Sequence, residues 1–332
     1  MTGLSPLLRF GTSTWTYEGW QGLVYHKTYA RNRFKQECLA EYAGYLYQGE
    51  PLFRTVGFDQ TFYRPPSDAQ LASFAQQLPA GFQVCSKVWE EITVPMFASH
   101  PRYGKKMGQA NPGFLDADRF LEEVLFPYSQ AFRAHTGPFL FEFQRTGVDP
   151  KTFLSRLDRF LSRLPKAFSY AIELRDIGLL TADYQSLLKV HGVSHVYNHW
   201  TYMPALRQQH ARLEEIFTAP FVVIRLLTPL GMTYENAVRT TRPYNRLVRP
   251  LPEMRADVMR LIRQGTAEHR EVFVLVNNRA EGCAPLTTQA LVDDLTRPPG
   301  KGSVSADPGR AGAMGATPRG PLGVEGAFVE PA

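Results

Sequence analysis

Short apolar runs alternate with amphipathic segments along the first 296 residues of the chain. Eight of these runs are rich in β-branched and aromatic residues and are predicted to be strands: 7–14, 55–61, 82–88, 139–144, 169–175, 193–199, 221–227 and 272–278. Strands that alternate with helices are typical of parallel βα units, and eight such units predict a single (β/α)8 TIM barrel. A TIM barrel has its chemistry at the C-terminal ends of its strands.

Helical periodicity is found between most of the runs. Leu154, Leu157, Leu161 and Leu164 repeat at three- and four-residue spacing, which predicts one apolar face against the barrel. The expected helices are 33–47, 68–77, 116–133, 150–164, 181–191 and 252–264, with a further one near 286–295.

Two long loops follow strands and carry many basic side chains. The first spans about 89–115, with His100, Arg102, Tyr103, Lys105 and Lys106, and the second spans about 228–251, with Tyr234, Arg239, Arg242, Tyr244, Arg246 and Arg249. Loops of this length in a compact domain are often functional. The loops are either ordinary solvated surface or a basic lid over the C-terminal end of the barrel.

Alternation along the strands predicts which side chains lie inside the barrel. Residues two apart share a face of a strand, so Leu140 and Glu142 lie opposite Phe139 and Phe141. The large apolar residues should face the helices, which leaves the polar residues inside. This rule places three carboxylates and three cations at one end of the barrel: Asp59, Glu142, Glu173, Lys87, Arg175 and Arg225.

Two interpretations of this charged set remain open. Charges in a low-dielectric interior are tolerated when they are paired and hydrogen-bonded. In one interpretation the carboxylates Asp59, Glu142 and Glu173 are catalytic acids or bases, and the cations bind an anionic group. In the other, all six form a compensated ion-pair network that fills the barrel without any catalytic role.

Other residues at the strand ends are candidates for substrate binding. Trp15 follows the first run, and Tyr63 and Arg64 follow the second. An aromatic ring at such a position stacks on a planar or sugar ring, or simply closes the barrel. Asn277 and Asn278 end the eighth run, where two carboxamides either bind a polar ligand or satisfy loop backbone.

Several chemistries find no support in the sequence. His191, His195 and His199 recur every four residues, but His195 and His199 fall on a predicted strand with His191 in the loop before it. No H-E-x-x-H is present, so we expect no metal site. Phosphate-binding, dinucleotide-binding and nucleophile-elbow glycine motifs are missing, and no cofactor is indicated. Glycoside hydrolysis is disfavoured because the seventh run offers Arg225 where a second carboxylate is needed.

Composition sets the broad class of the protein. Hydrophobic residues make up 44% of the 332, which suffices for a large core, and 37 Lys+Arg against 31 Asp+Glu give a charge of +6. That charge is compatible with an anionic ligand. Three scattered cysteines and the lack of a signal peptide or an apolar membrane span indicate a reduced, cytoplasmic protein without membrane contact. We expect a barrel domain over 1–296 and a disordered Gly/Pro/Ala-rich tail over 297–332.

The order of short motifs resembles the YecE-like family, which is catalogued as a domain of unknown function. The shared motifs are residues 11–15 (GTSTW), 20–22 (WQG), Tyr25, 61–65 (TFYRP), Phe82 to Lys87, 173–175 (ELR), Arg225, and Asn277 and Asn278 with Ala284. The resemblance spans roughly residues 8–296 and implies a TIM barrel, but no known reaction.

This chain also departs from the family pattern. Gly57 and Asp59 stand where the family usually has Glu and Asn, Glu142–Arg145 replaces Gln-x-Pro-Pro, and Arg225–Thr228 replaces R-x-H-G. A divergent branch is therefore indicated. Asp59 and Glu142 would offset the carboxylate lost at Gly57.

The functional expectation is an enzyme, a hydrolase, lyase or isomerase, that acts on a small anionic substrate such as a phosphorylated sugar or a nucleotide-like molecule. Two alternatives remain. The protein is a non-catalytic binder of nucleic acid or another polyanion through the basic loops, or it is a scaffold whose site has decayed. The sequence does not indicate an oligomeric state.

Overall fold

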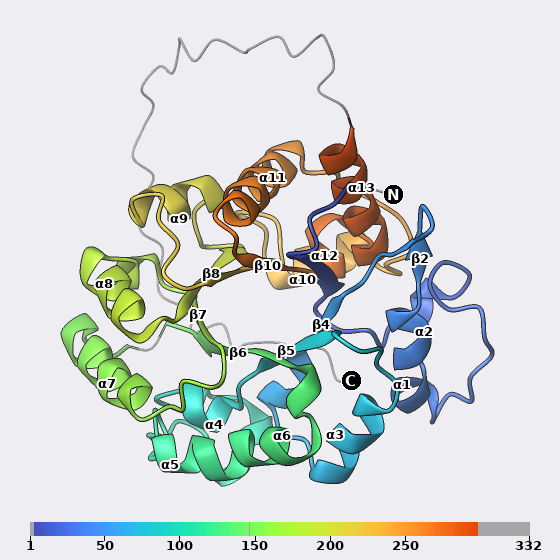
Figure 1. Cartoon of the computed structure of the whole chain (residues 1–332). Coiled ribbons are helices and arrows are strands. Elements are labelled where there is room, and N and C mark those ends of the chain that lie inside the picture. The colour runs from blue at the N-terminus through green and yellow to red at the C-terminus, as the bar shows by residue number, and fades with distance from the viewer. Residues whose placement is uncertain (1–2, 146, 298–332) are drawn as a thin grey trace, which may run out of the picture.

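The computed structural model describes residues 3–145 and 147–297. Eight parallel strands form one sheet in the order β1-β10-β9-β8-β7-β6-β5-β4, and the sheet curls into a nearly closed barrel inside a ring of helices (Figure 1). The strands are β1 Leu8–Thr12, β4 Thr55–Phe58, β5 Gln83–Lys87, β6 Thr136–Phe143, β7 Tyr170–Leu174, β8 Ser194–His199, β9 Phe221–Leu226 and β10 Glu271–Val276. The predicted TIM barrel is confirmed, and each of its strands overlaps a predicted run.

Helices alternate with the strands along the chain, and most of them form a ring around the outside of the barrel (Figure 1). They are α1 Phe34–Glu37, α2 Leu39–Ala43, α3 Asp68–Ala75, α4 Glu90–Thr93, α5 Ala117–Arg119, α6 Phe126–Ala131, α7 Pro150–Ser162, α8 Ala182–His191, α9 Leu206–Arg212, α10 Tyr234–Thr241, α11 Pro252–Ala267, α12 Asn278–Glu281 and α13 Ala284–Thr296. A short antiparallel pair, β2 Leu46–Tyr47 and β3 Glu50–Pro51, lies outside the barrel sheet.

Several helices differ from their expected extent. The predicted helix 33–47 is two short helices that end before Gly44, and 116–133 is interrupted by a π-helical turn, Phe120–Leu125. That turn ends two residues before Pro127, which has no N–H to continue the helical ladder. Helices α9 and α10 were not predicted, because they lie in segments that contain Pro204 or follow Gly231 and have no long apolar stripe.

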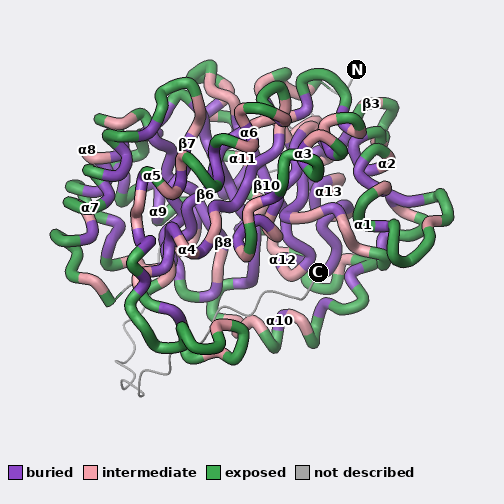
Figure 2. Tube along the Cα trace, turned by 90° about the horizontal axis from the view of Figure 1, so that it is seen from below, coloured by how far each residue is buried: buried purple, intermediate pink, exposed green. Residues whose placement is uncertain are grey.

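The strands have apolar side chains on both faces, one facing the helices and the other facing the inside of the barrel. The outward rings Phe139, Phe141 and Phe143 of β6 are buried under the helices, where Phe141 lies 5.3 Å from Phe160 of α7. The inward residues form a separate small cluster: Cys85, Leu140, Ala171, Val196, Ala219, Phe221, Val223, Phe273 and Leu275. The predicted alternation is therefore confirmed. Figure 2 shows buried segments along the strands and exposed ones on outer helices and loops.

The barrel closes where β1 approaches β4, and two glycines make that approach possible. A Cβ at Gly11 would lie 2.1 Å from the carbonyl oxygen of Thr55, and one at Gly57 would lie 2.8 Å from that of Ser13. Neither distance is compatible with a side chain. The backbones of the two strands are therefore in direct contact, and a carboxylate at position 57 is excluded by this geometry.

Within residues 3–145 and 147–297, no helix has the length and apolarity needed to cross a membrane. The expected tail at 297–332 lies outside the described residues apart from Arg297.

Candidate functional site

The six predicted charged residues meet at the C-terminal ends of the strands. Lys87 ends β5, while Glu142 and Glu173 are register partners near the ends of β6 and β7. Arg175 directly follows β7. Arg225 lies in β9, and Asp59 begins the 3-10 turn Asp59–Phe62 after β4. Positions far apart in the sequence are thus brought together by the barrel alone.

Glu142 is bound by two cations at the centre of this cluster. Its Oε2 lies 2.9 Å from Nζ of Lys87 and 2.8 Å from Nη2 of Arg175. Nη1 of Arg225 is 3.7 Å from the same oxygen. The other carboxylate oxygen accepts a hydrogen bond from Gln144. Both oxygens of this carboxylate therefore have protein donors.

Arg225 connects Glu142 and Glu173 to Asp59. Its Nη1 lies 2.5 Å from Oε2 of Glu173, and its Nη2 lies 2.7 Å from both carboxylate oxygens of Asp59. Glu173 also contacts Nη2 of Arg175 at 2.5 Å. The side chains of five members are between 0% and 6% exposed, whereas that of Asp59 is 20% exposed.

The formal charges of the cluster cancel, with three carboxylates against three cations. Burial favours a neutral Glu142, but Arg175, Lys87 and Arg225 outweigh it and hold the pKa of its carboxyl well below 4.5. Asp59, Glu173 and Glu142 in turn raise the pKa of the Arg225 guanidinium, although burial opposes them. Glu142 is therefore an ionised counterion at neutral pH and a poor proton acceptor.

The arginines retain hydrogen-bonding capacity in the part of the chain that the structure describes. Nε and Nη1 of Arg175 and Nε of Arg225 are buried and have no protein partner there. The guanidinium of Arg175 stacks on the ring of Trp200, with its Cζ 4.6 Å from the centroid, and Nζ of Lys87 lies 3.9 Å from that of Phe62. Buried N–H groups without a protein acceptor are typical of sites that bind an external oxygen.

Asn198 lies beside the charged cluster and was not predicted from the sequence as a site residue. It lies next to Arg225 in the β8–β9 register and is fully buried. Its Nδ2 donates to the carbonyl of Leu174 at 2.8 Å, while its Oδ1 has no partner among the described residues. The alternation rule applied to 193–199 would have found it, because Val196 and Asn198 share the inward face.

The first long loop is attached to the mouth of the barrel by Glu90. Nη2 of Arg102 lies 2.6 Å from Oε2 of Glu90, and the hydroxyl of Tyr103 donates to the same oxygen at 2.7 Å. Arg102 also stacks on Tyr63 at 4.9 Å. Burial raises the pKa of Glu90. Glu90 had not been predicted, although an acidic residue three positions after Lys87 is a visible signal.

Three of the other predicted binding residues lie in different environments: the apolar core, the surface and the start of a helix. Trp15 is buried in the main core against Phe58 and Phe74, with centroids 4.9 and 5.4 Å away. Arg64 is exposed. Asn277 caps α12 by accepting from the N–H of Arg279 at 3.0 Å.

Asn278 connects the segment after β10 to Trp20 and to the start of α13. Its Oδ1 accepts from Nε1 of Trp20 at 3.2 Å and from the N–H of Ala284 at 2.8 Å. The structure therefore places the ring of Trp15 in the apolar core and uses the amide oxygen of Asn278 to hold Trp20 and the backbone of Ala284.

Two of the recurring histidines, His195 and His199, lie in β8 on the face opposite to Asn198, whereas His191 ends α8. Nδ1 of His195 lies 3.1 Å from the hydroxyl of Tyr184, and its Nε2 lies 3.3 Å from Oε1 of Gln209. Burial lowers the pKa of His195 to about 4. His191 contacts Asp158 at 2.7 Å instead. The described residues contain no group of three or more side chains able to hold a metal ion.

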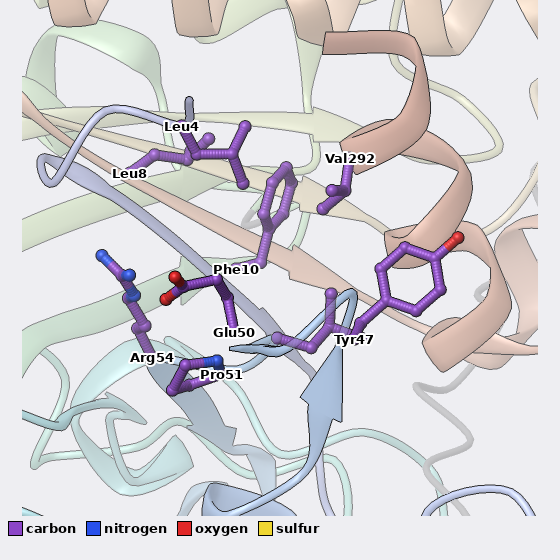
Figure 3. A pocket seen from close by; sticks show the side chains of 9 residues that line it. Leu4, Leu8, Phe10, Tyr47, Glu50, Pro51, Arg54 and Val292 are labelled. Carbon is purple, nitrogen blue, oxygen red and sulfur yellow. The ribbon is translucent and has the colours of Figure 1, made fainter. Parts of the chain in front are cut away.

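Two surface hollows lie away from this cluster. One is lined by Leu8, Phe10, Tyr47 and Val292, at the start of β1 and so at the opposite end of that strand (Figure 3). The other lies between the start of α5 and helix α7, where Arg156, Arg159 and Arg163 line it. The charged cluster is thus distinct from both.

The fold and the cluster define a TIM-barrel protein with a charge-balanced mouth. The profile of DUF72, described as a protein of unknown function, matches residues 9–309, and the chain belongs to this family. The barrel resembles two solved DUF72 family proteins. One, from Enterococcus faecalis, is 18% identical, with a TM-score of 0.61 over 87% of this chain and 95% of that one.

The other solved protein, from Thermotoga maritima, is 17% identical, with a TM-score of 0.60 over 87% of this chain and 99% of that one. These likenesses support the fold. No curated protein matches the chain.

Proposed function

We propose that this protein is an enzyme that acts on a small anionic substrate, a phosphorylated sugar or a nucleotide-like molecule, at the C-terminal mouth of its barrel. The observation that carries the proposal is the convergence of Lys87, Arg175 and Arg225, with arginine N–H groups that lack protein acceptors. Such groups bind phosphate or carboxylate oxygens in preorganised sites. The chain would then be a YecE-like member of DUF72.

The carboxylates divide into two roles under this proposal. Glu142 is an unsuitable base because its pKa is lowered, and Glu173 is fully buried between Arg175 and Arg225. Both hold the cations in place. Asp59 is the member of the set that a substrate can reach, so we assign proton transfer to it. General acid–base catalysis of this kind serves hydrolases, lyases and isomerases.

Aromatic side chains beside the cations support a substrate with a ring. Trp200 stacks on Arg175, and Tyr202 lies 5.9 Å from the guanidinium carbon of Arg145. Aromatic faces of this kind stack on bases or sugars. A cytoplasmic location agrees with the three cysteines, Cys38, Cys85 and Cys283, which are all buried and unpaired.

Thermal unfolding with a panel of sugar phosphates, nucleotides and small carboxylates tests the proposal. A ligand that binds the folded state raises the melting temperature. We expect one class of anion to stabilise the wild type and not Lys87→Met, while the exposed control Lys105→Met responds as the wild type does. An anion response that is identical in Lys87→Met would contradict the assignment. Turnover of the stabilising ligand, followed by mass spectrometry, then tests catalysis.

Polyanion binding is the second candidate, favoured by the exposed Arg239, Arg246 and Arg249 of the second loop. The first loop supports it less, since Arg102 and Lys106 are paired with Glu90 and Glu91. Binding of single-stranded or duplex nucleic acid that weakens steeply with salt would favour this candidate.

A further inference from the structure

The pair formed by Asp59 and Arg225 differs from the other ion pairs of the cluster. Asp59 is 20% exposed, whereas Arg225 beneath it is 1% exposed. Both oxygens of Asp59 lie 2.7 Å from one nitrogen, Nη2, so its carboxylate covers a single donor of the guanidinium. A partly solvent-exposed carboxylate is therefore paired with a deeply buried guanidinium.

Charge balance shows what this position requires. Without Asp59 the cluster has two carboxylates and three cations, a net charge of +1. Arg225 would keep Glu173 at 2.5 Å and Glu142 at 3.7 Å, but both of these also bind Arg175. A buried cation without compensation is costly, so an anion must stand where Asp59 stands.

The turn that carries Asp59 does not depend on its side chain. Among the described residues, the carboxylate of Asp59 has Arg225 as its hydrogen-bond partner. Thr61 holds the turn instead, because its hydroxyl lies 2.6 Å from the carbonyl oxygen of Phe58 and 2.5 Å from that of Lys87, which share its one hydrogen. A rotation of the Asp59 side chain toward solvent would leave these bonds intact.

We propose that Asp59 is a built-in counterion on an anion subsite at Arg225, and that an oxyanion of the ligand, a carboxylate or a phosphate, takes its place. This inference rests on the proposed function and deepens it by naming the cation that receives the anionic group. Nε of Arg225, buried and without a partner in the described chain, supplies a second donor to the incoming oxyanion. Displaced from Arg225, the carboxylate of Asp59 stands beside the bound ligand.

Isothermal titration of Asp59→Asn with inorganic phosphate and with acetate tests the proposal. The substitution keeps the shape and removes the competing charge, so we expect at least one of these anions to bind about tenfold or more tightly than it binds the wild type. Asp68→Asn, an exposed change of the same charge on α3, should bind as the wild type does. Phosphate and acetate are titrated separately, and the anion that gains more identifies the ligand's oxyanion.

A double variant tests whether the tighter binding requires Arg225. Asp59→Asn with Arg225→Gln leaves Glu142 and Glu173 against Lys87 and Arg175, so its charges are again balanced and it should fold. We expect this variant to lose the tightened binding. If it binds the anion as tightly as Asp59→Asn does, Arg225 is not the subsite.

The remaining outcomes separate the two proposals. If wild type and Asp59→Asn bind an anion equally, or if Asp59→Asn only lowers the melting temperature, Asp59 is not a competitor and this inference fails, while the proposed anionic substrate stands. If neither protein binds phosphate or acetate and no anion of the larger panel stabilises the wild type, the anionic substrate of the proposed function fails as well.

Discussion

Glu142 and Glu173, register partners on β6 and β7, bind one and the same nitrogen, Nη2 of Arg175, at 2.8 and 2.5 Å. Two carboxylates on adjacent strands repel each other unless a cation lies between them. Arg175 supplies that cation, and Lys87 and Arg225 compensate for the remaining charge. The cluster is therefore a unit whose members depend on each other.

Glu173→Gln should lower the free energy of unfolding by about 3–5 kcal/mol, the range for removing one partner of a buried ion pair. The change leaves Arg175 and Arg225, 6% and 1% exposed, with too little negative charge. Urea unfolding measures the loss. Glu123→Gln serves as a matched control, because Glu123 is 47% exposed against Arg119 and its removal should cost less than about 1 kcal/mol. Equal stability of the two variants would show that Glu173 is not buried between its arginines.

Acid should weaken the fold through Glu142. Its pKa is lowered in the folded state, so the unfolded chain takes up the proton first as the pH falls. The stability that Glu142 contributes is complete above about pH 4.5, the ordinary value, and is lost progressively below it. Urea unfolding from pH 6 to pH 3 should show a shallower decline for Glu142→Gln than for the wild type. Parallel curves would exclude this contribution.

His195 should weaken the fold in a higher pH window. Burial lowers its pKa from 6.5 to about 4, so the folded protein keeps the ring neutral while the unfolded chain is protonated below pH 6.5. Its contribution, about 3 kcal/mol, is present above pH 6.5 and lost as the pH falls toward 4. Nuclear magnetic resonance of the His195 ring at pH 5 is the direct measurement. A protonated ring in the folded protein at that pH would contradict the burial that the structure describes.

Trp200 should report binding at the mouth of the barrel. It stacks on Arg175 at 4.6 Å, while Trp15 and Trp20 are buried in the core. A ligand that engages Arg175 should therefore change tryptophan fluorescence in the wild type. The change should persist in Trp89→Phe, since Trp89 stacks on Arg119, and vanish in Trp200→Phe. A response that survives Trp200→Phe would place the ligand elsewhere.

The sequence allowed the barrel and its charged interior to be predicted because strand alternation is a local property. Phe139, Phe141 and Phe143 share one side of β6, which places Leu140 and Glu142 on the other. A parallel barrel then brings the ends of its strands together, so the meeting of Glu142 with Glu173 and Arg225 follows from geometry.

Side chains beyond the strand ends could not be predicted in this way. Strand β1 ends at Thr12, so alternation no longer applies at Trp15, whose ring packs under the helices. The link between Asn278 and Trp20 joins segments 258 residues apart, and no local pattern specifies it. Glu90 likewise acquires its partners Arg102 and Tyr103 only through the path of the first loop.

The approach of β1 to β4 also bears on how the mouth can change shape. In the described sheet these two strands stand at opposite ends of the hydrogen-bonded order. Gly11 and Gly57 bring their backbones into contact without a ladder, and the N–H of Arg54, just before β4, donates to the carbonyl of Phe10 at 2.9 Å. Asp59 follows the second of these strands directly. We therefore expect the barrel to widen most easily at this junction. Asp59, which covers Arg225, follows a strand that has a ladder on one side only.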